Sequence, residues 1–199
     1  MPDSPQRGPC EICVLAGGLS RRMGRDKARL RLGNANLLHH VVAAARPIGA
    51  PVRIIRRDTV PRCGPMGGVF TALSTTRSDT VLFLACDMPM VSSELLRWLI
   101  EKAPCAPDGW FVRSSSQIGF PFLLPRRILP IVTCHLDQKK FSLYALAQRL
   151  KSKIVLVPRR FALELINVNT PADLAKLTRL RFQRGRPLFK SKRSPSTKM

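Results

Sequence analysis

The chain has 199 residues, of which 45% are hydrophobic, and a formal net charge of +22 at pH 7. This length and composition predict one α/β domain with a substantial core. No stretch reaches the roughly 18 consecutive apolar residues of a membrane helix, and residues 1–8 carry no apolar run of the signal-peptide type. We therefore expect a cytoplasmic protein without a membrane partner. The charge favours anionic ligands such as nucleotides or nucleic acid. The alternative is that the whole proteome is basic, in which case the charge says nothing specific about this protein.

The first distinctive pattern is an apolar run, Ile12–Ala16, which predicts a buried strand and leads into Gly17-Gly18. A glycine pair at a strand end lets the backbone turn sharply and lets a ligand approach where a Cβ would otherwise stand. Backbone N–H groups in such a turn can point at an anion. The cations that follow are Arg21, Arg22, Arg25 and Lys27. The stretch is thus a candidate polyphosphate site, although it fits neither the Walker loop nor G-x-G-x-x-G, and a strand followed by a solvated basic loop is the alternative.

Helical and strand-like patterns alternate along the rest of the chain. Helices are expected over residues 37–46, 69–74, 94–103 and 141–150, and from Pro171 onward. Strands are expected over residues 51–56, 80–85, 109–112 and 154–157, with a further strand ending at the asparagines of Asn167-Val168-Asn169.

A second glycine-containing loop lies between the strand predicted over 51–56 and the helix predicted over 69–74. It contains Asp58 and then Gly64-Pro65-Met66-Gly67-Gly68. Glycines at a helix start permit close backbone approach, and a helix N-terminus favours negative charge. The loop is therefore a second candidate for ligand contact, and a plain Gly/Pro turn is the alternative.

The clearest buried strand, Thr80–Ala85, ends in Cys86-Asp87-Met88-Pro89. An acid at the carboxyl end of a central parallel strand lies where doubly wound sheets bind ligands. Beside a triphosphate, such a carboxylate can hold Mg²⁺. The alternative is that Asp87 caps the next helix, but Ser92 and Ser93 can do so instead. We interpret Asp87 as a metal ligand.

Two other patterns have simpler interpretations. Cys10-x-x-Cys13 resembles a metal or redox pair, but a structural zinc site needs four ligands and no second pair follows. Because Cys13 lies inside a predicted strand, we interpret it as a small apolar residue. Thr170 and Pro171 are explained as a helix cap and first helical residue, whereas capping does not explain Asn167 and Asn169.

Together, these motifs resemble those of the nucleotidyltransferases that finish the molybdenum cofactor. The first loop, Leu-Ala-Gly-Gly-x-Ser-Arg-Arg-Met-Gly-x-Asp-Lys over residues 15–27, is most similar to that of the guanylyltransferases among them. The resemblance covers residues 12–177. It implies a three-layer α/β/α fold with a mostly parallel, Rossmann-like sheet, in one domain over residues 1–177. We expect the basic segment 178–199 to be a disordered tail.

The resemblance also implies the reaction. GMP would be transferred from GTP to molybdenum-molybdopterin, with Mg²⁺ as cofactor and pyrophosphate as the leaving group, and cofactor-biosynthesis and acceptor proteins would be partners. Nucleotide contacts are implied for Leu15, Ala16, Gly17, Gly18, Ser20, Lys27, Asp58, Gly64, Gly67 and Asp87. Catalytic roles are implied for Arg21, Lys27 and Asp87, and contacts to the second substrate or metal for Asn167 and Asn169.

Two alternatives to this function are considered. The first alternative is a cytidylyltransferase of the same pterin. Such enzymes usually carry Leu-Ala-Ala-Gly in the first loop, so Gly17 favours GTP. However, relatives usually have a further strand and helix before the acid matched by Asp58, with an asparagine near the base, and here only residues 46–57 lie in that place. The charge and tail also suggest a non-catalytic polyanion- or nucleic-acid-binding relative. Tyr144, Trp98 and Trp110 form no evident stacking platform of the kind that single-strand binders use.

Overall fold

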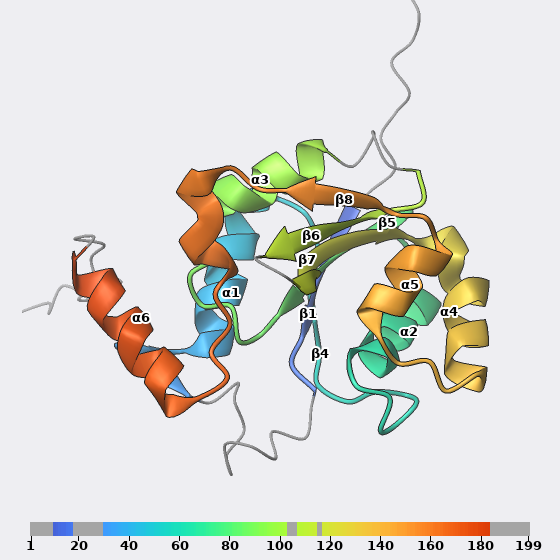
Figure 1. The fold of residues 1–199 in the computed structure, drawn as a ribbon, viewed down its shortest axis with the longest axis horizontal. Helices are drawn as coiled ribbons and strands as arrows, with labels where there is room; N and C mark the ends of the chain where they lie inside the picture. The colour runs from blue at the N-terminus through green and yellow to red at the C-terminus, as the bar shows by residue number, and fades with distance from the viewer. Residues whose placement is uncertain (1–9, 18–29, 103–106, 115–116, 184–199) are drawn as a thin grey trace, which may run out of the picture.

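A six-stranded sheet, ordered β4-β1-β5-β7-β6-β8, forms the centre of the computed structural model, which describes residues 10–17, 30–102, 107–114 and 117–183 (Figure 1). Its strands are β1 (Cys10–Leu15), β4 (Val52–Ile55), β5 (Thr80–Ala85), β6 (Trp110–Ser114), β7 (Gln117–Pro125) and β8 (Lys153–Leu156). β1 pairs in parallel with β4 and β5, and β6 pairs in parallel with β8. Only β7 runs antiparallel to its neighbours among these described strands.

Helices cover both faces of this sheet (Figure 1). On one face lie α1 (Leu37–Ala45), α3 (Ser93–Glu101) and the 3-10 segment η5 (Arg159–Leu165). On the other face lie α2 (Pro65–Thr75), α4 (Leu129–Asp137) and α5 (Leu143–Arg149). Short 3-10 turns, η2 (Arg46–Ile48) and η4 (Arg126–Ile128), complete these connections. The expected three-layer α/β/α architecture is confirmed.

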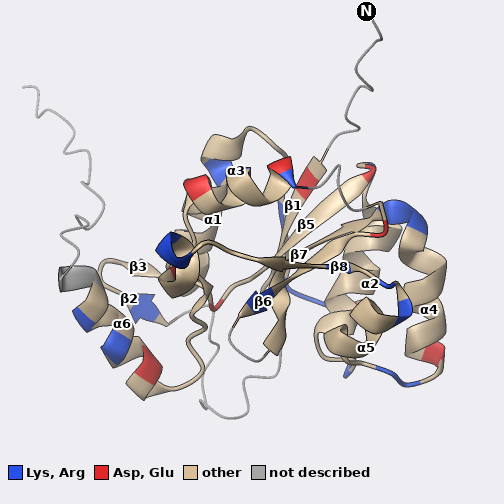
Figure 2. Ribbon diagram, turned by 45° about the horizontal axis from the view of Figure 1, so that its top comes forward, with Lys and Arg blue, Asp and Glu red and all other residues tan. Residues whose placement is uncertain are grey.

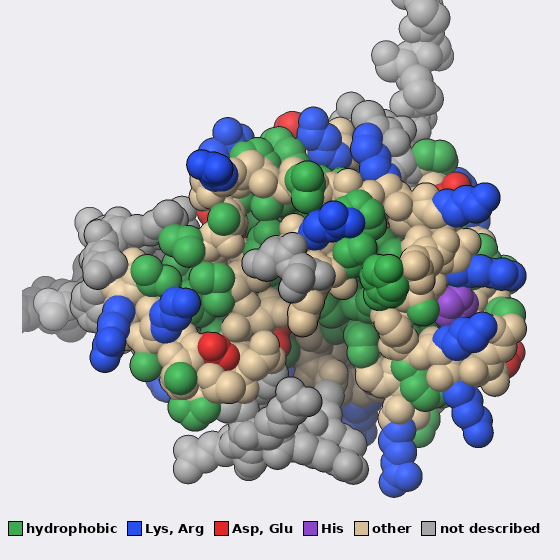
Figure 3. Space-filling model, in the orientation of Figure 1, with side chains coloured by type: hydrophobic (Ala, Val, Ile, Leu, Met, Phe, Trp, Pro, Cys, Tyr) green, Lys and Arg blue, Asp and Glu red, His purple; other side chains and the backbone are tan. Residues whose placement is uncertain are grey.

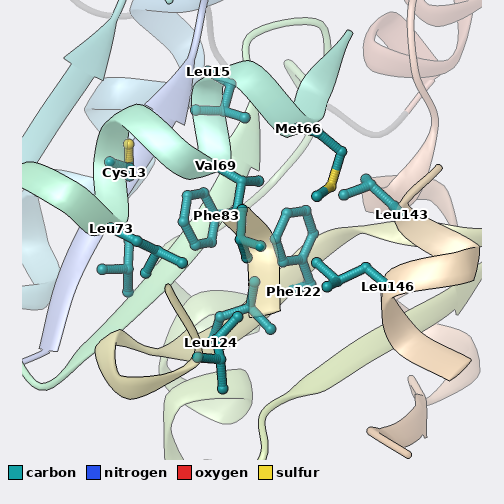
Figure 4. Packing of buried hydrophobic residues seen from close by; sticks show 14 of the residues in the cluster. Cys13, Leu15, Met66, Val69, Leu73, Phe83, Phe122, Leu124, Leu143 and Leu146 are labelled. Atoms are coloured by element: carbon teal, nitrogen blue, oxygen red, sulfur yellow. The ribbon is translucent and has the colours of Figure 1, made fainter. Parts of the chain in front are cut away.

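The central strands are apolar on both sides because helices cover both faces of the sheet. In β1, Ile12 and Val14 point into the core under α1 and α3, whereas Cys13 and Leu15 point into the core under α2. In the second core the rings of Phe83 and Phe122 stack with centroids 4.8 Å apart. Figure 4 shows these rings between side chains of two helices: Met66, Val69 and Leu73 of α2 and Leu143 and Leu146 of α5.

The same alternation separates the two cysteines of the C-x-x-C pattern. Cys10 packs at the edge of the first core and Cys13 lies in the second, so the two thiols face opposite sides of the sheet. Burial raises the pKa of Cys13 to about 12. This thiol is therefore protonated at neutral pH, as the interpretation of Cys13 as an apolar core residue requires.

Two expected elements differ from the structure. α2 begins at Pro65, four residues before the expected helix, because proline suits the first helical position and Met66 is already buried. The strand expected to end at Asn167 is not formed. Residues 159–165 form η5 instead, and Phe161 and Leu165 from this segment both enter the first core.

The last described element is α6 (Pro171–Gln183), which packs beside the short hairpin of β2 (Arg31–Leu32) and β3 (Ala35–Asn36). Leu177 of α6 is fully buried in a third apolar cluster, against which Leu174 and Leu180 also pack. The apolar face of the helix therefore continues beyond residue 177. The expected domain boundary after residue 177 falls inside a helix, and residues 178–183 are helical instead of disordered. Residues 184–199 lie outside the described residues.

Within the described part of the chain, none of the helices combines the length and apolar character needed to cross a membrane.

Candidate functional site

The candidate site lies at the carboxyl ends of the neighbouring parallel strands β1 and β5, the edge at which doubly wound sheets bind ligands. The Ala16 N–H donates to the Ile55 carbonyl at 2.8 Å, and the Cys86 N–H donates to the Leu15 carbonyl at 3.1 Å. These bonds hold the start of the first loop between β4 and β5. Four of the predicted site residues, Gly18, Ser20, Arg21 and Lys27, lie in residues 18–29, outside the described residues.

Three glycines surround the carboxylate of Asp58. A Cβ placed on Gly17 or Gly68 would lie 3.4 Å from Asp58 Oδ1, and one on Gly67 would lie 3.1 Å from Oδ2. The first loop and the start of α2 therefore meet at Asp58. The structure brings together Gly17, Asp58 and Gly67, which the sequence offered as members of two separate loops.

The loop that carries Asp58 is fastened to α2. The Thr59 N–H donates to Thr71 Oγ1 at 2.9 Å, and the Thr71 hydroxyl donates to the Gly67 carbonyl at 2.8 Å. Burial raises the pKa of the Asp58 carboxyl above its ordinary value. Gly64, at the N-cap of α2, has the positive φ of 56° that glycine adopts readily. The loop thus presents Asp58 beside the N-terminus of α2.

Asp87 follows β5 by two residues and is reached by the asparagine motif from the far end of the chain. The Val168 N–H donates to the Asp87 carbonyl at 2.8 Å, and the Val168 side chain is fully buried. Asn167 and Asn169, on either side of Val168, are exposed. Since neighbouring side chains of an extended segment point in opposite directions, the two asparagines face away from the cluster that holds Val168.

A reciprocal cap at the start of α6 fixes the backbone of Asn169. The Asp173 N–H donates to Thr170 Oγ1 at 3.1 Å. In return, Asp173 Oδ2 accepts from the N–H groups of Asn169 at 3.0 Å and Thr170 at 2.8 Å. These donors hold the pKa of Asp173 below its usual value. The Thr170 cap was predicted from the sequence. Asp173 was not, although its position three residues after Thr170 is the spacing of a capping box.

The surface is hollowed between these elements. Figure 3 shows the hollow between the side of the molecule formed by α6 and the side formed by α2 and α5, over the lower ends of the strands in that view. The side chains and backbone that edge the hollow therefore come from segments far apart in the sequence.

Comparison with known proteins identifies the family. Residues 12–153 match the MobA-like NTP transferase domain. The chain is 30% identical over 187 residues to a probable molybdenum cofactor guanylyltransferase of Carboxydothermus hydrogenoformans, covering 85% of this chain and 95% of that protein. It is 28% identical over 201 residues to the molybdenum cofactor guanylyltransferase of Pseudomonas paraeruginosa, covering 88% and 98%. The chain belongs to the MobA-like NTP transferase family.

Solved structures agree with this in fold. Molybdopterin-guanine dinucleotide biosynthesis protein A of Archaeoglobus fulgidus superposes with a TM-score of 0.68 at 18% identity, covering 87% of this chain and 99% of the other. A nucleotidyl transferase of Methanothermobacter also gives 0.68, at 19% identity and covering 88% and 99%. The expected Rossmann-like nucleotidyltransferase sheet is confirmed.

A MobA-like NTP transferase is a nucleotidyltransferase, so the predicted enzyme class is also confirmed. Such enzymes generally use a divalent metal. In the described part of this chain, no group of three His, Cys, Asp or Glu side chains gathers to hold a metal by itself. A single carboxylate nevertheless fits Mg²⁺, which takes one or two carboxylates and completes its shell with phosphate oxygens and water. Asp87, at the end of β5, meets that requirement.

The region that is short in this MobA-like chain contains little structure. Between α1 and Asp58 lie only η2 and β4, and β4 is the outermost described strand of the sheet. Residues 46–57 contain no asparagine. This segment therefore has no counterpart of the asparagine that the resemblance implies near the base in relatives.

Proposed function

We propose that this protein is a molybdenum cofactor guanylyltransferase that transfers GMP from GTP to molybdenum-molybdopterin. The observation that carries the proposal is the convergence at one sheet edge of two glycine loops around Asp58 with Asp87 and the asparagine motif. The names of the curated relatives support guanine as the base.

In this proposal the first loop binds the triphosphate. Leu15, Ala16 and the Gly17-Gly18 backbone, with Ser20, bind the phosphates. Arg21 and Lys27 offset the charge that builds on pyrophosphate as it leaves. Fixed points at both ends of the loop support this role, since Ala16 donates to Ile55 and the Leu30 carbonyl accepts from the Leu37 N–H at 2.8 Å.

Asp58, with Gly64 and Gly67 nearby, holds part of the guanosine. Close packing alone explains why residue 17 is glycine, because a Cβ there would lie 2.9 Å from the Arg56 carbonyl oxygen. The glycine is therefore no evidence for one base over the other. The preference for GTP over CTP consequently rests on the relatives and requires a direct measurement.

Asp87 would hold Mg²⁺ together with phosphate oxygens, and Mg²⁺ bound there supplies neutralisation of phosphate charge. Asn167 and Asn169 orient molybdenum-molybdopterin. An oxygen of its terminal phosphate forms the new bond to the α-phosphorus of GTP, and the bond from that phosphorus to the bridging oxygen breaks, so that pyrophosphate departs. The attacking phosphate is already ionised and needs no general base. Catalysis then consists of positioning and charge neutralisation.

The proposal is tested by calorimetry of GTP and CTP, each with and without Mg²⁺, on the purified full chain. We expect tight binding of GTP alone, strengthened by Mg²⁺. Mg²⁺-linked binding of CTP alone would assign a cytidylyltransferase instead. Equal, salt-sensitive binding of both nucleotides that is indifferent to Mg²⁺ would mean a polyanion-binding protein and would contradict the proposal.

Asp87→Asn is the matched variant, because it keeps the shape of the side chain and removes its charge. We expect it to lose the Mg²⁺-dependent part of GTP binding and to lower the rate of GMP transfer by about a hundredfold or more, the scale of losing one electrostatic contact to a transition state. Circular dichroism checks that the fold is retained. A near-normal rate would exclude Asp87 as the metal ligand.

A further inference from the structure

Glu164, in η5, is a buried acid that lies close to the proposed site without being part of it. Its side chain is almost fully buried, at 3% exposed. Its Oε2 accepts from the Ser92 N–H at 2.9 Å. Ser92 is the N-cap residue of α3, and its own Oγ accepts from the Leu95 N–H at 3.2 Å. A buried carboxylate is costly unless it is hydrogen-bonded, and a helix N-terminus stabilises negative charge. The contact is therefore a favourable and directional link between η5 and α3.

A second contact also joins residues 164–168 to the loop that follows β5. Four residues after Glu164, the Val168 N–H donates to the Asp87 carbonyl at 2.8 Å. The Val168 side chain packs in the same apolar cluster as Met90. Glu164 thus meets Ser92 at one end, and Val168 meets Asp87 at the other. The two segments run side by side in opposite directions, fastened at both ends.

The placement of Asn167 and Asn169 depends on both links, because these asparagines flank Val168. The Val168 bond sets how close the motif comes to Asp87. The Glu164 bond sets the direction from which the segment arrives. With the Glu164 contact removed, the segment keeps the Val168 bond and loses the contact that sets its approach to the Asp87 loop, so both asparagine side chains can shift relative to Asp87.

We propose that Glu164 is a positioning residue for the second substrate: through Ser92, it holds the asparagine motif against the Asp87 loop. This inference rests on the roles proposed above for Asp87, Asn167 and Asn169. Glu164 itself acts from the buried side of the segment, whereas the asparagines are exposed.

The chain offers a matched control in Glu11, a second buried acid. Glu11 is 6% exposed and lies near the start of β1, at the opposite edge of the sheet from the proposed site. It accepts hydrogen bonds from Arg53 and from the Thr76 hydroxyl. Removing either carboxylate leaves buried or half-buried donors without their acceptor, so both changes are expected to lower stability. Only the change at Glu164 is expected to alter substrate kinetics.

The experiment measures kcat and both KM values for GMP transfer by the wild type, Glu164→Ala and Glu11→Ala, at a temperature where all three are folded. For Glu164→Ala, we expect kcat/KM for molybdenum-molybdopterin to fall between about tenfold and about a hundredfold, the scale of a misplacement of about 1 Å. KM for GTP should be unchanged. Glu164→Gln keeps an acceptor oxygen of the same reach and should restore most of the loss. Glu11→Ala should melt earlier than the wild type with unaltered kinetic constants.

Further variants distinguish a failure of the role of Glu164 from unfolding of a variant and from failure of the proposed function. Glu164→Leu fills nearly the same volume and avoids the cavity that alanine leaves. It also removes the acceptor of the Ser92 N–H, so it should show the same kinetic loss as Glu164→Ala. Wild-type kinetics in the leucine variant would overturn the role of Glu164. If Asn167→Ala and Asn169→Ala leave KM for molybdenum-molybdopterin unchanged, the asparagine role fails and the inference fails with it. If the two asparagine variants raise KM for molybdenum-molybdopterin while the Glu164 variants do not, only the role of Glu164 is wrong.

Discussion

At the scale of single residues, the glycines of the two loops are explained by their approach to one acid. A Cβ on Gly67 would lie 2.6 Å from the Val60 carbonyl oxygen and 3.1 Å from Asp58 Oδ2. One on Gly68 would lie 3.0 Å from Leu15 Cδ1. Position 67 therefore requires glycine, because the backbone of the Asp58 loop comes so close to α2. Position 68 accepts a Cβ only if the Leu15 side chain shifts. Asp58 is therefore both a candidate nucleotide contact and the centre of a packing arrangement.

Asp58→Asn tests whether that arrangement carries a cost in stability. Burial raises the pKa of Asp58 above the ordinary 3.8, so the ionised carboxylate is less favourable in the folded chain than in the unfolded one. The contribution of such a group to stability is fully present below the unfolded pKa and is lost as pH rises through the folded pKa. Asparagine does not ionise and avoids this loss. We expect Asp58→Asn to melt at a higher temperature than the wild type at neutral pH, with weaker GTP binding.

Thermal melts of both proteins from neutral pH down to about pH 4 check this expectation. The difference in melting temperature should shrink as pH falls toward the unfolded pKa, because the wild-type carboxyl is then increasingly protonated in both states. A variant that is less stable than the wild type at neutral pH would show that Asp58 makes favourable interactions in its ionised form.

At the scale of elements, α6 joins three segments of the proposed site. Leu177 packs in one cluster with Leu32, Met90 and Val168. Leu32 follows the first loop, Met90 follows Asp87, and Val168 lies between the asparagines. One face of α6 thus contacts three segments: the one after the first loop, the one after Asp87, and the one that carries the two asparagines.

Leu177→Ala should loosen these segments together. Truncating a fully buried leucine costs about 2–5 kcal/mol of unfolding free energy, measured by urea denaturation. Because the third cluster is small, we also expect faster hydrogen exchange at the Val168 and Leu37 amides, which bond to Asp87 and Leu30. Leu99→Ala in α3, also fully buried but in the first core, is the control. If its effect on those two amides is equal, α6 has no particular role in holding the site.

At the scale of the whole molecule, the positive charge is spread over the surface. Figure 2 shows Lys and Arg on α6 at one end, and on α5 and beside the ends of α4 at the other. A nucleic-acid interface typically gathers its cations on one face or along one helix. The described surface therefore supports an enzyme of anionic substrates better than a nucleic-acid-binding module.

A truncation after Gln183 tests the role of the positive charge of residues 184–199. It keeps α6 complete and removes the cations Arg184, Arg186, Lys190, Lys192, Arg193 and Lys198. We expect unchanged GMP transfer and a less steep dependence of polyanion binding on salt concentration. A truncation after Leu177 should melt earlier, because it removes Leu180 from the third cluster. Loss of GMP transfer in the chain that ends at Gln183 would mean that residues 184–199 serve the reaction.

The sequence alone determined the parts of this protein that depend on local pattern. β5 was expected over residues 80–85 and is found there, because its apolar run is bounded by polar residues. The order of loops and motifs was enough to name the family, since each motif is a short run of residues that can be recognised without knowledge of the fold. The short length of the segment between α1 and Asp58 was also visible, because it is a matter of residue count.

Only the tertiary structure decided what depends on contacts between distant segments. Residues 159–165 form η5 instead of leading into a strand, because the packing of Phe161 and Leu165 and the bond from Ser92 to Glu164 determine the backbone there. The length of α6 depends on the cluster that receives Leu177 and Leu180. The meeting of Asp58 with three glycines, and of Asp87 with Val168, joins residues far apart in sequence. Burial and hydrogen bonding across the fold select these arrangements, and local propensity does not contain them.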